Sequence, residues 1–416
     1  MRSVIYVGLM LFWVLTAWSQ NTAKIMFYNL LDFPEAPPDN RELILKDIID
    51  QVQPDVFMVA ELQNQNGADL ILNQALNDTQ NIYVIAPFVF NTSGSGGTIN
   101  QLLFYNTQKF GLELTDIIQT SLRDINRYQL KALTDQNQTN PIIIDFFVAH
   151  FKASQGDSNE QIRFDMALDF TNYINAHLSA NANVILAGDF NFYTANESGF
   201  QQLFIGNTII PMHDPVNQLG DWHINSTYSD VHSQSTRVSN SNFNGFGAGG
   251  GLDDRFDFIF VSGNFLDVNN QAHYIDGTYQ VFGNNSNCFN KNVNDTTCSG
   301  IFSQNIRNLL WNMSDHLPVV MDLEFEQNFL NTIHFSDSSI FKLPEGNIVD
   351  NTLFLEISAT HISEIKQLNI YNTLGQQMKT LDVLKSTMRI SMDDLSNGIY
   401  ILKANRGNAL KFVVLH

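Results

Sequence analysis

The stretch Asn183-Val184-Ile185-Leu186-Ala187-Gly188-Asp189-Phe190-Asn191 joins an apolar run to an acid and an amide. Such a short run, rich in Val, Ile and Leu, predicts a buried β-strand. A polar side chain directly after a strand lies at a sheet edge, where the rigid sheet can hold it for function. We therefore expect Asp189 and Asn191, two residues apart, to project to the same side and to belong to a functional site.

The same arrangement of an apolar run followed by a polar residue recurs along the chain. Its other members are Asn29 in Phe-Tyr-Asn-Leu-Leu, Glu61 in Val-Ala-Glu-Leu-Gln, His150 in Val-Ala-His-Phe-Lys, Asp257 in Arg-Phe-Asp-Phe-Ile, and Asp315 with His316 in Ser-Asp-His-Leu-Pro. Each alone is more often a turn, cap or structural residue. As a set they offer hard ligands for Mg²⁺ or Ca²⁺. Phosphodiester hydrolysis needs such a cation, a base for water and charge stabilisation.

Between residues 24 and 326, short β-like runs alternate with amphipathic stretches, which predicts a mixed layered fold rather than a helical bundle. One helix is expected after a capping box formed by Ser158 and Gln161, because apolar residues then recur every fourth position. Arg163 and Asp165 lie off that apolar face and are expected in solvent. The expected strands are 23–28, 55–60, 101–105, 142–149, 183–187, 255–261 and 319–325.

The N-terminus has the pattern of a secretory signal peptide, predicted over residues 1–19. Arg2 precedes an apolar run from Val4 to Leu15, and Ala17-Trp18-Ser19 follows it. A membrane anchor is the alternative, but an anchor needs roughly 20 apolar residues and this run is shorter.

Cys288 and Cys298 are the only cysteines. In an exported chain such a close pair predicts one local disulfide, and two unpaired thiols are the alternative. Zinc binding is not expected, because no His or further Cys accompanies the pair at zinc-site spacing.

The chain carries 42 acidic and 22 basic residues, a formal net charge of −20. This charge opposes non-specific binding of polyphosphates, although a cation or a local group of Arg and Lys can supply attraction at a site. Arg123, Arg127 and Lys131 are candidates to contact phosphates, with solvated surface charge as the alternative.

Residues 234–251 are rich in Ser, Asn and Gly, which predicts a flexible surface loop. Its Gly-Ala-Gly-Gly-Gly run lacks the Gly-Lys-Ser/Thr ending of a phosphate-binding loop. Phe243, Phe246 and Phe289 are the candidates for an apolar element that could enter a lipid interface.

After residue 326 short alternating strands with turns between them predict a small all-β sandwich over residues 333–416. A carbohydrate-binding sandwich is the alternative, but it would need exposed aromatic residues, and the tail offers almost none beyond Tyr371 and Tyr400. The expected strands are 353–357, 365–371, 378–381, 388–390, 399–404 and 410–414.

In order and spacing, the polar strand ends over residues 21–326 resemble the endonuclease/exonuclease/phosphatase superfamily, which includes deoxyribonuclease I, exonuclease III and neutral sphingomyelinases. Gly188-Asp189-Phe190-Asn191 and Ser314-Asp315-His316-Leu317-Pro318 are the most specific pieces. The resemblance implies an α/β (α+β) four-layered sandwich with two central mixed β-sheets and the site at one edge of both.

The resemblance also implies the metal site. Glu61 resembles the principal ligand, with Asn29 beside it, for a divalent metal that is Mg²⁺ or alternatively Mn²⁺ or Ca²⁺. Asp315 is expected near the metal. Leu31 stands where DNA-repair members carry an Asp, so abasic-site repair is disfavoured, and Asp32 is one step out of register for a ligand.

The remaining residues correspond to the family's catalytic groups. Asp189 resembles the residue that orients or deprotonates water, and Asn191 would hold the phosphate. His316, paired with Asp257, would sit over the phosphate. His150 matches the position of an acid or phosphate-binding histidine.

The tail resembles the C-terminal sorting domain of type IX secretion substrates, at residues 368–376, 395–400 and 411–414, although the usual Pro-Asn-Pro opening is missing. The resemblance implies the type IX secretion machinery as a partner. We therefore expect a monomeric, secreted phosphodiesterase, in the first place an extracellular nuclease acting on DNA or RNA. A sphingomyelinase-like phospholipase is the alternative, and a catalytically silent binding protein on the same scaffold is the alternative of another class.

Overall fold

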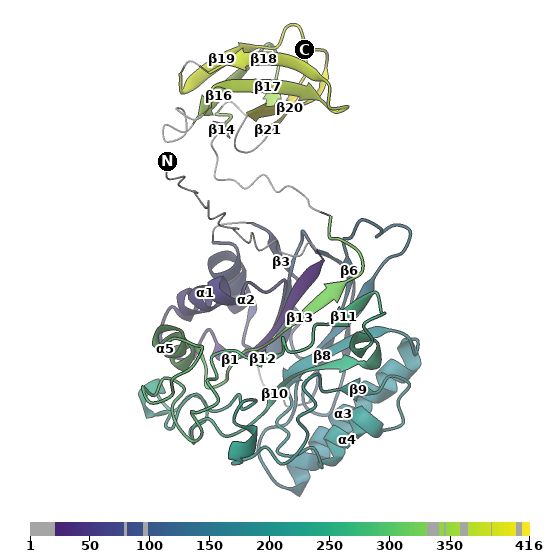
Figure 1. The fold of residues 1–416 in the computed structure, drawn as a ribbon, viewed down its shortest axis with the longest axis vertical. Coiled ribbons are helices and arrows are strands. Elements are labelled where there is room, and N and C mark those ends of the chain that lie inside the picture. The colour runs from purple at the N-terminus through teal and green to yellow at the C-terminus, as the bar shows by residue number, and fades with distance from the viewer. Residues whose placement is uncertain are drawn as a thin grey trace, which may run out of the picture. The chain divides into compact units, whose positions relative to one another are not determined.

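The computed structural model describes residues 21–78, 81–94, 99–330, 341–344, 347–357, 365–383, 385–404 and 410–416 (Figure 1). The predicted signal peptide lies outside these ranges. The chain forms two compact units, one made of the residues up to 78 and from 82 to 331 and one made mainly of the residues from 332 onward, and each is described by itself. No helix in the described ranges combines the length and the apolar character that crossing a bilayer requires.

The first sheet of the larger unit has seven strands, in the order β11-β13-β1-β2-β4-β3 with β12 beside β13. β1 pairs in parallel with β2 and antiparallel with β13, so the sheet is mixed, as predicted. Its strands are β1 (Thr22–Phe33), β2 (Val56–Leu62), β3 (Tyr83–Ile85), β4 (Asn100–Asn106), β11 (Ala272–Tyr274), β12 (Gln280–Val281) and β13 (Val319–Phe325).

The second sheet has six strands, in the order β5-β6-β7-β8-β10-β9. β7 and β8 are parallel, whereas β10 runs antiparallel to β8, so this sheet is mixed too. Its strands are β5 (Phe110–Ile118), β6 (Ile125–Ala132), β7 (Ile143–His150), β8 (Asn183–Asp189), β9 (Met212–His213) and β10 (Asp257–Ser262).

Helices cover the outer face of each sheet, which completes the four predicted layers (Figure 1). α1 (Arg41–Val52), α2 (Gln65–Leu70), the π-helical turn η1 (Ile71–Leu76) and α5 (Gln304–Met313) lie on the side of the first sheet, and α3 (Asp157–His177) and α4 (Ser198–Ile205) on the side of the second. Short 3₁₀ turns are η2 (Ser226–Tyr228), η3 (Ser241–Phe243) and η4 (Gly263–Leu266).

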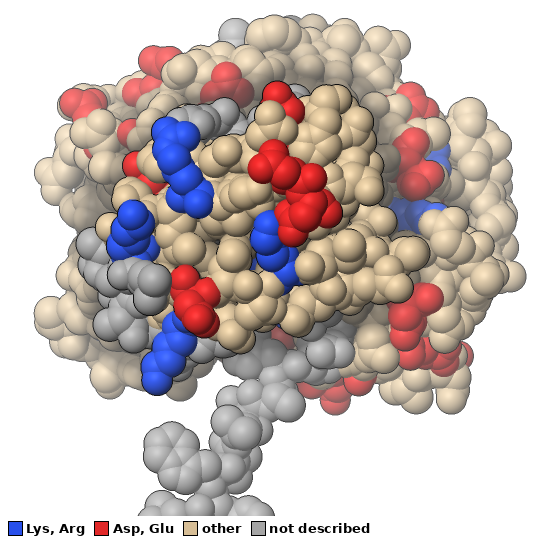
Figure 2. Space-filling view, turned by 90° about the horizontal axis from the view of Figure 1, so that it is seen from above, with Lys and Arg blue, Asp and Glu red and all other residues tan. Residues whose placement is uncertain are grey.

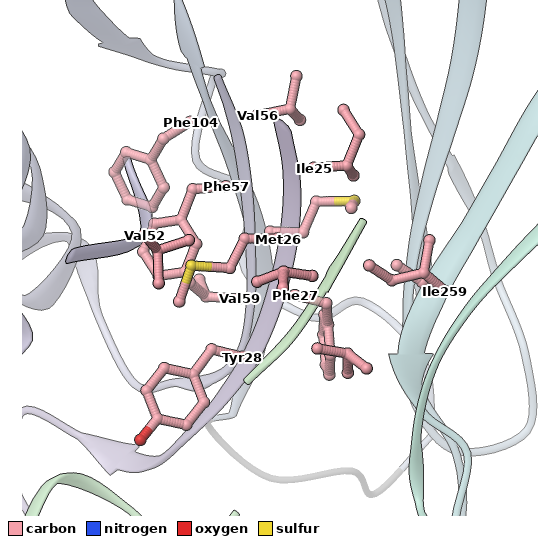
Figure 3. Packing of buried hydrophobic residues seen from close by; sticks show 14 of the residues in the cluster. Ile25, Met26, Phe27, Tyr28, Val52, Val56, Phe57, Val59, Phe104 and Ile259 are labelled. Carbon is pink, nitrogen blue, oxygen red and sulfur yellow. The ribbon is translucent and has the colours of Figure 1, made fainter. Parts of the chain in front are cut away.

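The strands of the core carry apolar residues on both faces, because each sheet is covered on both sides. Figure 3 shows Ile25 of β1 on the side of Ile259 of β10, between the two sheets. Phe57 and Phe104, whose rings stack at 6.0 Å, lie with Val52 of α1 on the other side. All seven strands predicted for this unit form.

The predicted capping box of α3 is wrong. The helix begins at Asp157, with Gly156 as the N-cap residue and no side-chain cap hydrogen bond. Ser158 therefore lies inside the first turn, beyond the position from which its hydroxyl could cap the helix.

Arg163 of α3 is fully buried, so its expected place in solvent is also wrong. Its Nε donates to Glu197 Oε2 at 2.7 Å, and its Nη1 donates to the carbonyls of Lys152 and Ser154 at 2.9 Å each. The hydrophobic period of a helix cannot reveal a buried arginine whose donors are satisfied by partners distant in sequence.

The Gly-rich segment 234–251 forms a surface loop, as predicted, and specific contacts attach parts of it to the rest of the larger unit. Phe243 is only 3% exposed, and its ring lies under the guanidinium of Arg237 at 3.4 Å and edge-on to Trp311 at 4.9 Å. The Ala248 N–H donates to Asp315 Oδ2 at 2.6 Å. Phe243 therefore cannot serve as a membrane-entering element.

The predicted disulfide between Cys288 and Cys298 is present. Both cysteines are buried in the main core of the larger unit. Phe289, between them, is half-buried, and its ring lies 5.9 Å from His232.

The smaller unit is all-β, as predicted, with a three-stranded sheet in the order β14-β16-β19 and a five-stranded sheet in the order β15-β21-β20-β17-β18. Tyr400 is buried and stacks on Phe412, so it is not an exposed ring that could bind a sugar. The strands are β14 (Phe341–Lys342), β15 (Ile348–Val349), β16 (Thr352–Ile357), β17 (Gln367–Asn372), β18 (Gln377–Asp382), β19 (Thr387–Ser391), β20 (Gly398–Ala404) and β21 (Leu410–Val414).

Gly188 permits the close approach of β7 and β8 that positions the candidate site. It pairs with Ala149, and the next pair along the two strands is His150 with Asp189. A Cβ atom at Gly188 would stand 2.3 Å from the Ala149 carbonyl oxygen, much too close for any side chain. The glycine therefore allows the register that places the histidine and the acid side by side.

Replacing Gly188 with Ala should lower the free energy of unfolding by about 1–3 kcal/mol, because the strands must separate to admit the methyl group. The matched control is Gly111→Ala in β5, where a Cβ would meet only a Leu133 methyl group at 3.6 Å. That change should be neutral or stabilise by about 0.4–1 kcal/mol. Urea denaturation followed by circular dichroism measures both, and equal stabilities of the two variants would contradict the steric explanation.

Candidate active site

Asn29 joins the two sheets at the carboxyl end of β1. Its Nδ2 donates to Glu61 Oε1 and to Asp189 Oδ2, each at 3.0 Å. Its Oδ1 accepts from the Leu31 N–H at 3.0 Å, because the strand bulges here and Leu31 has a φ of 50°. One buried amide therefore connects an acid of the first sheet with an acid of the second.

Glu61 lies in a second bulge, where the pairing of β2 with β4 shifts between Val59 and Leu62. Its φ is 57°, in the left-handed region that few residues other than glycine adopt. Its Oε2 accepts from the Asp32 N–H at 3.1 Å. Burial, and then the charge of Asp315, raise the pKa of Glu61.

His150 ends β7 beside both carboxylates. Its Nε2 lies 3.5 Å from Asp189 Oδ2 and 3.9 Å from Glu61 Oε1. Burial lowers the pKa of His150 well below its usual value, and Arg123 acts in the same direction. The imidazole is therefore neutral, and it can donate or ligate through one nitrogen at a time.

Asp189 is the last residue of β8, and the chain turns immediately after it. Asn191 has a φ of 53°, and its N–H donates to Asp189 Oδ1 at 3.2 Å. Strand alternation, on which the sequence expectation rested, therefore does not extend to Asn191. The Asn191 side chain donates to the Phe151 carbonyl at 3.4 Å, next to the site. Burial raises the pKa of Asp189 to about 8, although His316 opposes the shift.

His316 and Asp257 form the pair that the sequence predicted. His316 Nδ1 lies 2.7 Å from Asp257 Oδ2, and the Ser233 hydroxyl donates to the same oxygen at 2.6 Å. His316 Nε2 lies 3.6 Å from Asp189 Oδ2. Burial disfavours the imidazolium, but Asp257, Asp189 and Asp315 outweigh burial and raise the pKa of His316 well above its usual value.

Asp315 faces the loop over residues 234–251. Its Oδ2 accepts from the Ala248 N–H and, at 3.1 Å, from Gln234 Nε2. Gln234 Nε2 also lies 2.6 Å from His316 Nε2. No sequence pattern singles out Gln234 or Ser233, because neither follows an apolar run.

The acidic residues fit a divalent cation. Glu61, His150 and Asp189 each offer a ligand atom, and these atoms lie within 4.8 Å of one another, as do those of Asp189, Asp257 and His316. Asn29 presents its nitrogen to the carboxylates, so the fit of the first group rests on its carboxylate oxygens and the imidazole. Oxygen ligands of this kind suit Mg²⁺, Mn²⁺ or Ca²⁺.

One of the three predicted phosphate-contacting cations lies at the site. Arg123 Nη1 donates to the carbonyls of His150 and Phe151 at 3.2 and 3.0 Å. The predictions for Arg127 and Lys131 are wrong. Arg127 is buried, with Nη2 2.7 Å from Asp145 Oδ1, and Lys131 pairs with the first residue of β7, at the end opposite His150.

Several solved structures are similar to this chain. The human nocturnin catalytic domain with bound sulfate is 16% identical over 73% of this chain and 94% of its own, with a TM-score of 0.45. D. rerio TDP2 complexed with a single strand DNA product is 14% identical over 73% and 99%, with a TM-score of 0.47. An endonuclease/exonuclease/phosphatase family protein from Bacteroides thetaiotaomicron is 16% identical over 73% and 95%, with a TM-score of 0.43. No curated protein matches the chain.

Two family models match the sequence. Residues 349–414 match the Secretion system C-terminal sorting domain, which implies export by type IX secretion. Residues 26–316 match the Endonuclease/Exonuclease/phosphatase family, whose members are metal-dependent phosphoric ester hydrolases. Since that match spans more than half of the chain and covers every polar strand end described above, the protein belongs to the Endonuclease/Exonuclease/phosphatase family and is a metal-dependent phosphoric ester hydrolase.

Proposed function

We propose that the protein is a secreted phosphodiesterase that hydrolyses nucleic acid, an extracellular nuclease acting as a monomer. The observation that carries the proposal is the position of Asp189. Its Oδ2 lies 3.5 Å from His150 Nε2 and 3.6 Å from His316 Nε2, and the Asn29 amide links it to Glu61. Asp189 can thus act as a base, and His150 and His316 beside it can stabilise negative charge that develops on the phosphate.

A divalent cation, Mg²⁺ in the first place, would be held by Glu61 with Asn29 beside it and would supply positive charge that polarises the phosphodiester. After burial, the negative charge of Asp315 is the next cause that raises the pKa of Glu61. The charge of Asp315 therefore acts at Glu61 and would favour a cation bound there. Burial is the main cause of the raised pKa values of Glu61 and Asp189, and a bound cation would favour the charged form of both acids.

Asp189 orients the attacking water and accepts its proton. Asn29 and the Asn191 N–H hold the two oxygens of this carboxylate, which fixes its direction. A carboxylate held in this way can act as a base without reorganising during the reaction. Asn191, whose amide is only weakly engaged at 3.4 Å, would contact a phosphate oxygen.

His316 stabilises charge on the phosphate. Asp257, which accepts from the Ser233 hydroxyl, holds its Nδ1 side, and Nε2 lies 2.6 Å from Gln234 Nε2 and 3.6 Å from Asp189 Oδ2. Because carboxylates on several sides favour its protonated form, it can donate a charge-assisted hydrogen bond to a phosphate oxygen. His150 is neutral, and its Nε2 would donate a hydrogen bond to the phosphate from the side opposite His316.

Nucleic acid ranks above lipid as the substrate. Of the three phenylalanines that the sequence offered for membrane entry, Phe243 is buried and Phe246 and Phe289 are half-buried. A sphingomyelinase-like activity would need an exposed apolar element near the site. On the face drawn in Figure 2, the Lys and Arg side chains stand apart from one another among neutral and acidic residues. Because the net charge of the chain is −20, we expect attraction to a polyanion to depend on the site itself.

Asp189→Asn should lower the hydrolysis rate of DNA or RNA at least ~100-fold, because the base is lost while the shape is kept. Turnover with Mg²⁺, Mn²⁺ and Ca²⁺ in turn is the measurement, and Asp135→Asn, an exposed acid beyond the far end of β6, is the control. A folded Asp189→Asn variant with near wild-type turnover would overturn the assignment, as would full activity after exhaustive chelation.

Asp257→Asn and His316→Gln should each reduce the rate by ~100-fold or more, and the double variant should be no slower than the slower single variant. The reason is that Asp257 acts through His316, so the second change removes an interaction already lost. Rate effects that multiply in the double variant, with normal melting temperatures, would show that the two residues act independently.

A chain of residues 21–330 should fold and keep its activity, since the larger unit contains every residue of the candidate site. Removal of residues 333–416 from the full gene should instead abolish export, because the sorting domain lies there. Activity in the medium of the native cells, together with the mass of the exported protein, is the measurement. A shortened chain that cannot fold, or an exported product with an intact tail, would contradict this division of roles.

A further inference from the structure

Phe90 is the one phenylalanine whose side chain is strongly exposed in the described part of the chain, at 61%. It follows β3 in a segment without regular structure, between Ala86 and Ser93. Phe88, which is half-buried against the main core, supports it edge-on, with the ring centroids 5.0 Å apart. The ring of Phe90 is thus held in a fixed place while most of its surface stays open to solvent.

Hydrogen bonds attach this segment to the end of β2 that carries Glu61. The Asn91 N–H donates to Asn100 Oδ1 at 2.7 Å, and Asn100 Nδ2 donates to the Leu62 carbonyl at 2.8 Å. Leu62 directly follows Glu61. These bonds therefore tie the backbone beside Phe90 to the strand end that carries Glu61.

The same segment is bound to the loop that carries Arg123. The Asp124 N–H donates to Asn91 Oδ1 at 2.8 Å, and the Thr92 N–H donates to Asp124 Oδ2 at 2.7 Å. The Ser93 hydroxyl donates to Asp124 as well. Asn91 and Asp124 are thus joined by a hydrogen bond. Phe90 directly precedes Asn91 in the chain, and Arg123 directly precedes Asp124.

Arg123 reaches from this loop to the catalytic edge of the second sheet, where it donates to the carbonyls of His150 and Phe151. Its Nε is buried and has no partner among the described residues. Burial lowers the pKa of Arg123, whereas Glu61 and Asp189 oppose the shift, so the guanidinium lies within electrostatic reach of both acids. Arg123 therefore lies at the site, and the segment that carries the exposed Phe90 ring is bonded both to the Arg123 loop and to the strand end of Glu61.

We propose that Phe90 and Arg123 form a subsite for the nucleotide next to the scissile phosphate. Arg123 contacts the adjoining phosphate, and the base stacks on the Phe90 ring. The inference rests on the proposed nuclease function, because the nucleotide in this subsite is linked to the scissile phosphate that binds beside Asp189. In a duplex both faces of each base are already covered, so this subsite selects a single strand.

A lipid surface is the competing occupant of the same residues. Only Val89, 37% exposed, accompanies Phe90 as an exposed apolar side chain in this segment. Entry into a bilayer interface needs a larger apolar face, usually flanked by several basic residues. One supported ring beside one guanidinium matches the stacking and charge pattern of single-strand binding.

The test measures binding of labelled single-stranded DNA and RNA oligonucleotides, and of the corresponding duplex, by fluorescence anisotropy in Mg²⁺. Asp189→Asn is present throughout so that cleavage does not interfere. Phe90→Ala should weaken single-strand binding about 10-fold, the size of one base–aromatic stack, and Phe90→Trp should preserve it. Val268→Ala, an exposed apolar residue beyond the opposite end of β10, should have no effect.

Arg123→Gln should lower the slope of log affinity against log salt by about 0.7, the value for one phosphate contact on a single strand. With Asp189 restored, Phe90→Ala should raise KM for oligonucleotides and leave kcat unchanged. The subsite proposal would be overturned if Phe90→Ala bound single strands as tightly as the protein that keeps Phe90. Duplex binding as tight as single-strand binding would overturn it too.

Phe90→Leu separates the two occupants, because leucine keeps the apolar surface and loses the aromatic face. It should bind oligonucleotides as weakly as Phe90→Ala. Sedimentation with vesicles of phosphatidylcholine and sphingomyelin should show no binding that depends on Phe90. Vesicle binding that Phe90→Ala abolishes and Phe90→Leu restores would overturn the proposal in favour of a lipid surface. A protein that cleaves neither DNA nor RNA with any metal refutes the nuclease function itself, which the binding measurements distinguish from failure of the subsite alone.

Discussion

The buried amide of Asn29 is the contact on which the candidate site depends, because it holds an acid of each sheet at 3.0 Å from one nitrogen. Two buried carboxylates repel each other, and without a shared donor the edges of the sheets would be driven apart. The bulge after Asn29 makes this possible, since the Leu31 N–H turns back to fix the amide. Ser314 completes the junction by donating from its hydroxyl to the Asn29 carbonyl at 2.8 Å.

Charge at this junction is only partly balanced within the chain. His316 is the one imidazolium among the buried acids described above, and Arg123 adds a second positive charge at the site. Burial is the main cause of the raised pKa values of Glu61 and Asp189, and neighbouring acids add to it. A buried site that holds its acids close together is suited to a cation, which agrees with the proposal that the same few residues bind the metal and act in catalysis.

The parts of the fold and site that could be predicted are those encoded in local patterns. Apolar runs gave all seven expected strands, and polar residues at their ends, such as Glu61 and His150, meet because a sheet brings strand ends to one edge. Residues that act through contacts between distant loops left no local signal. Gln234, Ser233 and Phe90 belong to this group, and buried Arg163 was assigned to solvent because its partner Glu197 is 34 residues away. The turn after Asp189 is a separate case. Strand alternation applies only within the strand, and β8 ends before Asn191.

The net charge of −20 and the proposed polyanionic substrate are compatible because attraction acts locally. At physiological ionic strength the Debye length is about 8 Å, so charges elsewhere on the surface are largely screened from a phosphate bound at the site. In the proposed site such a phosphate would meet His316, Arg123 and a cation held by Glu61. The general acidity of the surface opposes long-range capture of nucleic acid, and it therefore leaves affinity to short-range contacts such as stacking on an exposed ring. For this reason an aromatic residue in the proposed subsite matters more to this protein than it would to a basic nuclease.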